Sequence, residues 1–307
     1  SPRRPPAPCE IPPFSLNVRF FRFQIAPMTR HVRPQARFAS TCAPAPVDQA
    51  QGLRQMFVSR VLRFIPVVAN SRSGCGGLVL ERLCAAYASF GLNTLVVDAS
   101  DQARAPSELV AFDLGEGIET LSTQVSYMAA RGLPLRHADA RGSCASLLPA
   151  LADASPRSDV VLVHASASEI VRLFGQPARG IPLRPLVFTN DMAEGLTDAY
   201  AAVKILSQRG GWMSYDLLMC APLESAQAEP VAQRLARCAD DFLGVAQRSA
   251  HQLDPQQAPT ADPDPHFMEM AAALLHGALP LSLGDSAFEH LTSPGSALPA
   301  RVASAHN

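Results

Sequence analysis

The chain has 307 residues, of which 48% are hydrophobic and 17% are charged, and its formal net charge is −1. This composition supports a buried core and excludes a strongly basic nucleic-acid-binding protein, and no apolar run is long enough to span a membrane. The seven cysteines form no C-x-x-C pair and no histidine stands at metal-ligand spacing. We therefore expect reduced thiols, a cytoplasmic protein and no metal site.

Residues 1–46 differ in composition from the rest of the chain. They contain seven arginines, a single acid, Glu10, and many prolines without any regular periodicity. An arginine-rich and acid-poor stretch is typical of a targeting peptide, but the prolines oppose an amphipathic helix. We predict a disordered extension with no function of its own, and we interpret it as an over-long start with Met28 as the favoured internal start.

Residues 47–60 are predicted to form a short N-terminal helix. They contain the run Asp48-Gln49-Ala50-Gln51-Gly52-Leu53-Arg54, followed by further apolar residues. Taken without any comparison, this run is a polar helix start in which the carboxylate of Asp48 caps the first turn.

The next elements follow a recognisable order. An apolar strand over 65–69 leads into a loop of small residues over 70–77, then an amphipathic helix, then a second strand over 94–98. This order is typical of the phosphate-binding start of a nucleotide-hydrolysing α/β domain, in which a loop lysine holds the β- and γ-phosphates and a Ser or Thr holds Mg²⁺. Here the chain's single lysine is Lys204, and Arg72 is the only cation in the loop.

The remaining sequence alternates between helix and strand patterns. The unbroken apolar run at 159–163 indicates a strand that is buried on both faces. The alternation predicts one α/β domain over 61–291, a doubly wound and mostly parallel sheet with helices on both faces. The predicted helices cover 106–114, 117–130, 144–152, 196–208, 229–242 and 266–276, the strands 133–137, 159–163, 181–188 and 216–220, a linker 252–265, and a disordered tail 292–307.

Two motifs give the chain a resemblance to a known family. Asp48–Arg54 reads D-Q-A-x-x-L-R and Thr197–Lys204 reads T-D-A-Y-A-x-x-K. Together they resemble FlhG (also YlxH, FleN or MotR), the MinD/ParA-type ATPases that control flagellar number and placement. The first motif separates that family from other MinD relatives, which share the second. The resemblance covers about residues 47–291 and implies a P-loop NTPase fold, with ATP and Mg²⁺ as the family's cofactors.

The resemblance places the family's phosphate loop on residues 70–77 without gaps. Ser71 then stands where the family has the lysine that reaches across the dimer, Gly76 where it has the phosphate-gripping lysine, and Gly77 where it has the Mg²⁺-binding threonine. We therefore expect a degenerate nucleotide loop without a bound cofactor. Its vestigial cofactor-binding residues would be Arg72, Ser73, Gly74, Gly76, Gly77 and Asp98.

Three further family positions have changed at the ends of predicted strands. The second acid after Asp98 is replaced by Ser100, the Walker B aspartate by His164, and the base-recognising asparagine by Cys220. For His164 we favour a packed or hydrogen-bonded side chain over a metal ligand, because the sequence offers no second ligand. We expect no catalytic residue and a lost nucleotide switch, since hydrolysis needs neutralised phosphates and a held Mg²⁺.

The resemblance also implies a protein partner. In the family the N-terminal segment docks onto FlhF, an SRP-type GTPase, and its glutamine stimulates GTP hydrolysis. Gln49 would be that glutamine here and Arg54 a docking contact, while a merely polar helix start stays the alternative. The partner-binding residues would be Asp48, Gln49, Ala50, Leu53 and Arg54. The flagellar C-ring and a flagellar transcription regulator are further candidate partners.

The second motif has a structural interpretation. Thr197 would cap a helix, Asp198 would favour its positive end, and Lys204 would be solvated or lie on a dimer face. Residues 287–291 carry two large apolar residues and no basic one, so we expect weak or no membrane binding. We expect no nucleic-acid partner, and a homodimer stays open.

Two other functions stay open. One is a working ATPase with an unusual loop that uses Arg72, although a fork-shaped guanidinium replaces a compact ammonium poorly. The other is the MinD-like protein of cellulose-synthesis operons, which lacks the D-Q-A segment.

Overall fold

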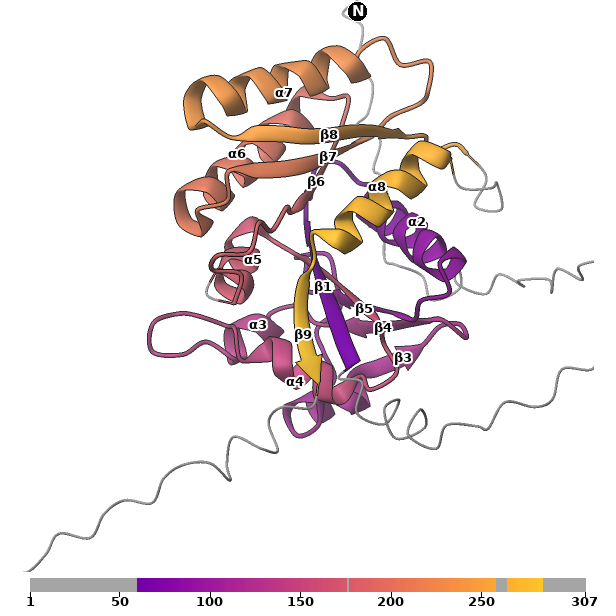
Figure 1. Cartoon of the computed structure of the whole chain (residues 1–307), viewed down its shortest axis with the longest axis vertical. Helices are drawn as coiled ribbons and strands as arrows, with labels where there is room; N and C mark the ends of the chain where they lie inside the picture. The colour runs from indigo at the N-terminus through magenta and orange to yellow at the C-terminus, as the bar shows by residue number, and fades with distance from the viewer. Residues whose placement is uncertain (1–59, 176, 258–263, 284–307) are drawn as a thin grey trace, which may run out of the picture.

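The computed structural model describes residues 60–175, 177–257 and 264–283. In this part of the chain one mostly parallel sheet lies between helices on both faces, so the predicted α/β class is confirmed (Figure 1). The strands are β1 (Arg60–Val68), β2 (Thr94–Asp98), β3 (Ile118–Thr120), β4 (Val125–Ala129), β5 (Val160–Ala165), β6 (Leu186–Asn190), β7 (Ser214–Cys220), β8 (Ala246–Leu253) and β9 (Leu279–Leu283). The helices are α2 (Gly76–Ser89), η1 (Glu108–Ala111), η2 (Leu114–Gly117), α3 (Leu133–Arg136), α4 (Leu147–Ala154), α5 (Ala167–Phe174), α6 (Ala193–Gly210), α7 (Ala228–Leu243) and α8 (Pro265–His276), where η marks a 3-10 helix.

The strands run in the order β3-β4-β2-β5-β1-β6-β7-β8. All neighbours in this series are parallel except β3 and β4, and β9 pairs antiparallel with the amino-terminal half of β1. His164 stands opposite both Val67 of β1 and Asp98 of β2. The carboxyl ends of the central strands therefore meet at one edge of the sheet, where ligands of open α/β sheets bind.

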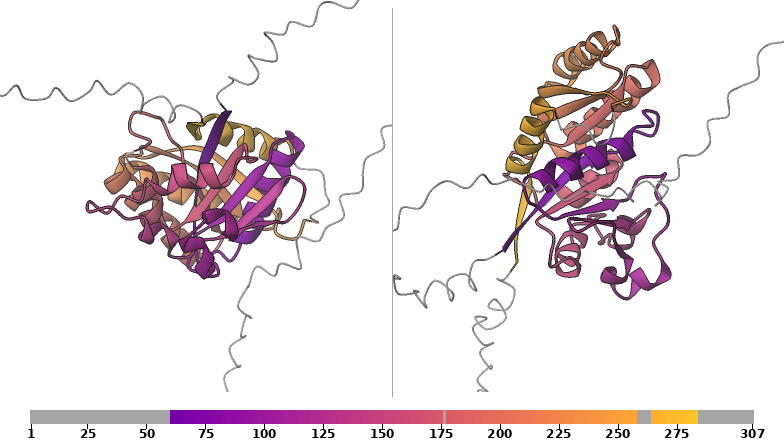
Figure 2. Two further views of the ribbon diagram at one scale, coloured as in Figure 1. Left: turned by 90° about the horizontal axis from the view of Figure 1, so that it is seen from below. Right: turned by 90° about the vertical axis from the view of Figure 1, so that its right-hand side faces the viewer.

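Alternate residues of the central strands feed two hydrophobic cores. Leu62 and Phe64 of β1 face one side, and Ile65 and Val67 face the other. Helices α4 to α7 cover the first side, while α2 and α8 cover the second, where the hydroxyl of Tyr87 donates to the carbonyl of Ala271 at 3.2 Å (Figure 2). Burial on both faces explains why the central strands read as unbroken apolar runs.

The predicted helix over 117–130 is wrong, because this segment forms the antiparallel strands β3 and β4. The hydroxyl of Ser122 accepts from the backbone N–H groups of Gln124 and Val125, which closes the turn between them. β4 pairs in parallel with β2 along its whole length, from Val125 opposite Thr94 to Ala129 opposite Asp98. Tertiary pairing with a buried neighbour therefore outweighs a weak helical periodicity.

The predicted strand over 133–137 is also wrong, because it is the one-turn helix α3. Gly132 has a positive φ of 75° and Pro134 lies in the first turn, which together start a helix and not a strand. The segment 106–114 forms short 3-10 pieces instead of one helix. The strand expected from residue 181 begins only at Leu186, because Pro182 and Pro185 precede it.

The sequence analysis missed three elements: α5, β8 and β9. β8 ends at Leu253 and α8 begins at Pro265, so the predicted linker overlaps both elements. β1 starts at Arg60, which shortens the predicted helix 47–60 by one residue. The rest of that helix, the extension 1–46, the segment 287–291 and the tail 292–307 lie outside the described residues.

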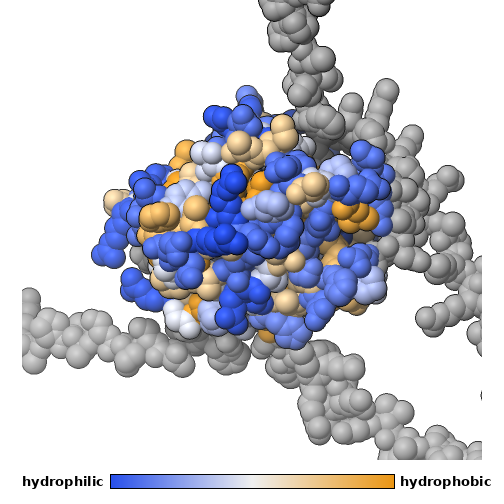
Figure 3. All heavy atoms as spheres, turned by 90° about the horizontal axis from the view of Figure 1, so that it is seen from above, coloured by the Kyte–Doolittle hydropathy of each residue, from blue (hydrophilic) through white to orange (hydrophobic). Residues whose placement is uncertain are grey.

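The surface seen from above in Figure 3 is mostly hydrophilic, with apolar residues scattered among polar ones. Scattered apolar side chains are normal on a folded protein. None of the helices in the described part of the chain combines the length and the apolar character needed to cross a membrane.

Candidate functional site

The loop between β1 and α2 lies at the carboxyl edge of the sheet, and the side chain of Asn70 holds it there. Asn70 is buried, and its Nδ2 donates to the carbonyl oxygens of Phe188 at 3.1 Å and Gly195 at 3.0 Å. Its Oδ1 accepts from the backbone N–H of Arg72 at 3.2 Å. One amide thus joins the loop to β6 and α6, because each of its polar atoms has a partner.

A second amide holds the loop from the other side. Nδ2 of Asn190, at the end of β6, donates to the carbonyl oxygens of Arg72 at 3.3 Å and Ser73 at 3.4 Å. The hydroxyl of Ser73 donates to the carbonyl of Asn70 at 2.8 Å. The carbonyl oxygens of Asn70, Arg72 and Ser73 therefore accept hydrogen bonds from within the protein. The side chains of Asn70 and Asn190 set the shape of the loop.

The loop cation Arg72 is directed to α6. Its Nε lies 3.5 Å from Oδ2 of Asp198, and the two side chains are 61% and 31% exposed. A pair this exposed contributes at most about 1 kcal/mol, so it orients Arg72 more than it stabilises the fold.

Asp198 was predicted to favour the positive end of its helix, but its carboxylate pairs with Arg72 of the loop. Helix α6 begins at Ala193, and Thr197 lies in its second turn, donating to the carbonyl of Ala193 at 2.9 Å. Thr197 is therefore not the cap that the sequence analysis expected. Lys204 is exposed and Val203 is buried, as expected for that helix.

A buried His–Asp pair lies beside the loop. Nδ1 of His164 is 2.9 Å from Oδ1 of Asp98, and the two side chains are 7% and 2% exposed. Asp98 Oδ1 also accepts from the N–H of Ser100 at 3.1 Å, and Oδ2 from the hydroxyl of Tyr127 at 3.4 Å. His164 is thus the hydrogen-bonded histidine that the sequence analysis favoured.

Burial raises the pKa of Asp98, but the hydrogen bond and charge of His164 and the hydrogen bonds from Ser100 outweigh it. The net result is a lowered pKa, and a carboxylate at this position stays ionised. Burial likewise raises the pKa of Tyr127, helped by the negative charge of Asp98.

The ring of His164 packs on the first turn of α2. A Cβ atom at Gly76 would lie 3.1 Å from Cε1 and 3.4 Å from Nε2 of His164, and 3.4 Å from Cζ of Phe188. The His164 and Phe188 rings are 5.8 Å apart between centroids. Nε2 of His164 is buried without a hydrogen-bond partner among the described residues. The position where the resemblance places a phosphate-gripping lysine is therefore closely bordered by two rings.

Two buried thiols connect the loop to β7. Cys75, which precedes α2, is hydrogen-bonded to Cys220 at the end of β7, and this bond lowers the pKa of Cys75 against the effect of burial. The same bond and burial raise the pKa of Cys220. Cys220 stands where the resemblance places the base-recognising asparagine, so a thiol pair occupies that position.

The structure brings together the predicted vestigial loop and the predicted strand ends. Arg72, Ser73 and Gly74 belong to the β1–α2 connection, and Gly76 and Gly77 begin α2. Asp98 reaches them through His164, which packs against Gly76. The predicted partner-binding residues Asp48, Gln49, Ala50, Leu53 and Arg54 lie outside the described residues. In the described ranges, no three His, Cys, Asp or Glu side chains are grouped closely enough to hold a metal ion.

The contacts of Asn70 and Asn190 were not predicted from the sequence, and neither was the contact of Asp198 with Arg72. Asn70 lies two residues after the end of β1 and Asn190 is the last residue of β6, so a polar residue at the end of an apolar run is a signal that could have indicated a group at the carboxyl edge. Their partners are more than a hundred positions away along the chain, so no local pattern reveals them.

No protein-family model and no curated protein matches the chain. Solved structures with a similar arrangement include cobyrinic acid a,c-diamide synthase from Mycobacterium smegmatis, with a TM-score of 0.48, 16% identity, 70% of this chain and 94% of that chain covered. A plasmid partition protein from Borrelia burgdorferi has a TM-score of 0.45, 9% identity and coverages of 70% and 96%. The MinC:MinD cell division protein complex of Aquifex aeolicus has a TM-score of 0.44, 12% identity and coverages of 78% and 98%. Identities this low concern the fold alone.

Proposed function

We propose that this chain is a MinD/ParA-like scaffold that regulates flagellar number and placement through contact with an FlhF-type GTPase, and that it has lost the ATP-driven switch. One observation carries the second half of the proposal. The side chains of Asn70, Asn190 and His164 fill and fix the β1–α2 connection.

The residues of this connection do not fit Mg²⁺-ATP. Binding of phosphates in such a loop needs cationic side chains and free backbone donors, and binding of Mg²⁺ needs an oxygen ligand. Here Arg72 contacts Asp198, and Gly76 and Gly77 stand at the family's lysine and threonine positions. A side chain at Gly76 meets His164 and Phe188 in tight contact, so the ring of His164, which is hydrogen-bonded to Asp98, must shift to admit it. We therefore propose that this chain does not hydrolyse ATP.

The partner half of the proposal is supported by the resemblance at residues 48–54. A short segment can act on a partner without help from the β1–α2 connection. A glutamine added to the active site of a GTPase can orient the attacking water, an effect worth orders of magnitude in rate. Gln49 would supply that group, with Leu53 as an apolar anchor and Arg54 as a docking charge.

The test uses the full chain and the FlhF-type GTPase of the same organism. Isothermal titration with Mg²⁺-ATP should show no binding, and the chain should raise the GTPase rate of the partner. Gln49→Ala should abolish that stimulation, whereas Gln51→Ala, a matched glutamine at a variable position of the motif, should retain it.

Each half of the proposal can fail separately. Low-micromolar ATP affinity, with turnover lost in Asp98→Ala, would establish the alternative of a working ATPase with an unusual loop. Stimulation that survives Gln49→Ala would place the active surface elsewhere, and no stimulation at all would refute the GTPase partner.

A further inference from the structure

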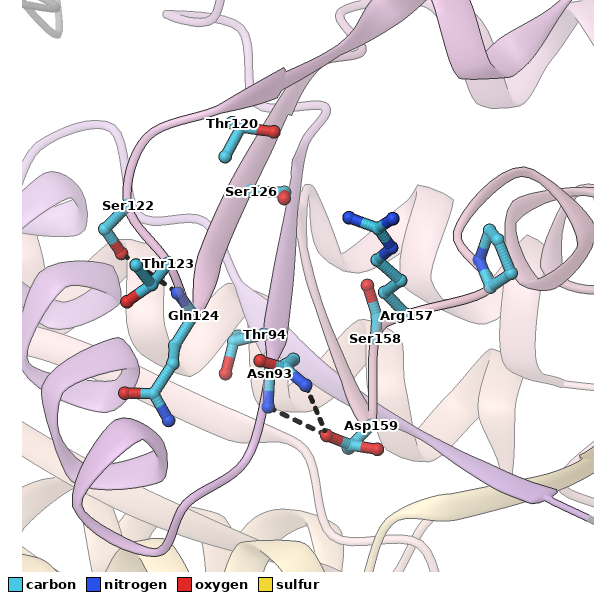
Figure 4. A pocket seen from close by; sticks show the side chains of 11 residues that line it. Asn93, Thr94, Thr120, Ser122, Thr123, Gln124, Ser126, Arg157, Ser158 and Asp159 are labelled. Carbon is cyan, nitrogen blue, oxygen red and sulfur yellow. Dashed lines mark hydrogen bonds between the residues drawn. The ribbon is translucent and has the colours of Figure 1, made fainter.

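A polar pocket lies at the opposite edge of the sheet, where the central strands begin. Its volume is about 390 Å³, which is at the small end of the range for sites of small molecules. One wall is the β3–β4 connection, the other is the turn over 156–159 before β5, and Asn93 and Thr94 lie between them (Figure 4).

The walls of this pocket are fixed by hydrogen bonds. Oδ2 of Asp159 accepts from the backbone N–H of Asn93 at 2.9 Å and from its Nδ2 at 3.2 Å. The N–H of Thr94 donates to the carbonyl of Gln124 at 2.8 Å. The strand starts and both walls are therefore held together without a ligand, as a pre-organised site requires.

Hydroxyl groups dominate the lining. Thr94, Thr120, Ser122, Thr123, Ser126 and Ser158 all line the pocket, and Pro156 is its one apolar residue. Thr94 is 1% exposed, and its Oγ1 has no hydrogen-bond partner among the described residues, which is costly for a buried hydroxyl. Hydroxyls both donate and accept, so this lining suits a ligand with hydroxyls of its own. It offers no aromatic surface on which a nucleobase could stack.

One cation stands at the rim. Arg157 is exposed and lines the pocket, and no carboxylate of the described residues forms an ion pair with it. Its side chain extends beside the pocket in Figure 4. The nearby carboxylate of Asp159 is turned to the two N–H groups of Asn93. A guanidinium forms paired hydrogen bonds with phosphate and carboxylate groups, so the rim suits one oxyanion.

We propose that this pocket binds a small polyhydroxylated molecule that carries a single phosphate or carboxylate group. Arg157 binds the oxyanion at the rim, and the hydroxyls of Ser126 and Thr120 bind those of the ligand. Thr94 gains its missing hydrogen bond at the base of the pocket.

The test measures binding to the full chain by titration calorimetry and by the shift in melting temperature. The probes are glucose 6-phosphate and gluconate, with glucose, inorganic phosphate and AMP as comparisons. Both hydroxylated anions should bind, and Arg157→Gln should weaken them at least about tenfold, since a charge-assisted hydrogen bond is lost. Arg141→Gln, which changes an exposed arginine outside the pocket, should leave their affinity unchanged.

Thr94→Val separates binding from folding. Valine keeps the shape of threonine and removes a hydroxyl without a partner, so the free protein should melt at the same or a higher temperature. The affinity for the bound probe should nevertheless fall severalfold. The proposal is overturned if neither anionic probe binds, if glucose binds as tightly as both, or if Arg157→Gln binds like the wild type.

Discussion

At the scale of single residues, the close contact between Gly76 and His164 favours a glycine at this position of α2. The imidazole of His164 is hydrogen-bonded to Asp98 and packs against the first turn of α2 at Gly76, where it leaves little room for a side chain. A change at either residue is therefore felt at the other, as expected for close-packed neighbours.

Gly76→Ala tests this packing. In the wild type the new Cβ meets His164 and Phe188, and we expect a loss of about 1 kcal/mol in the free energy of unfolding. In a His164→Ala background the same change should stabilise the protein by a few tenths to about 1 kcal/mol, because alanine suits a helix better than glycine. Urea denaturation of the four proteins measures the coupling. Equal effects of Gly76→Ala in both backgrounds would show that the two residues do not interact.

Asp98 makes stability depend on pH in the acidic range. Its pKa in the folded protein is below the ordinary value of 3.8, so on acidification the unfolded chain takes up the proton first. Its contribution is therefore complete above that ordinary value and is lost as pH falls through the folded pKa. Asp98→Asn should cost about 1–3 kcal/mol near neutral pH and progressively less in acid. Urea denaturation across that range measures the difference, with exposed Asp101→Asn as the control; a constant difference would contradict the argument.

At the scale of elements, the sequence predicted strands best where burial is most complete. The run 159–163 was recognised because both its faces are covered, and β5 extends it to Ala165. The run 117–130 was misread because β4 is held by pairing with β2, which no local pattern records. The candidate site divides in the same way: the loop follows from the order of the elements and the strand-end positions from the family resemblance, but neither indicates the two asparagines that hold the loop.

Helix α5 was missed although its start carries a readable signal. Ser166 and Glu169 form a capping box, in which each side chain accepts from the other residue's backbone N–H. Ser166→Ala should lower the free energy of unfolding by about 1 kcal/mol, because the backbone N–H of Glu169 loses its acceptor and the Glu169 carboxylate loses the hydroxyl that donates to it. Ser168→Ala is the control, because it changes a serine in the same first turn that is not part of the capping box. Thermal or urea denaturation measures the stability of both variants. Equal losses from both changes would show that the box does not stabilise the helix.

At the scale of the whole molecule, the proposed loss of the ATP switch predicts that assembly does not respond to ATP. Ser71 stands where the resemblance places the lysine that crosses the dimer, and Arg72 forms an exposed ion pair with Asp198 of the same chain. We expect the molar mass from light scattering to be the same with and without Mg²⁺-ATP, whatever that mass is. A doubling caused by ATP would refute the loss of the switch.

The antiparallel pairing of β9 with β1 has a mechanical consequence. Arg60 stands opposite Leu283, so both ends of this two-strand ribbon leave the sheet on the same side. A force that pulls residues 60 and 283 apart therefore breaks the hydrogen bonds between β1 and β9 one after another. It does not load all of them at the same time, as a shearing force along the strands would. Parallel neighbours hold the rest of β1, at Val67 and Val68 to β6 and from Arg63 onward to β5. In a single-molecule stretching experiment β9 should peel away first and at low force, before the remaining sheet yields.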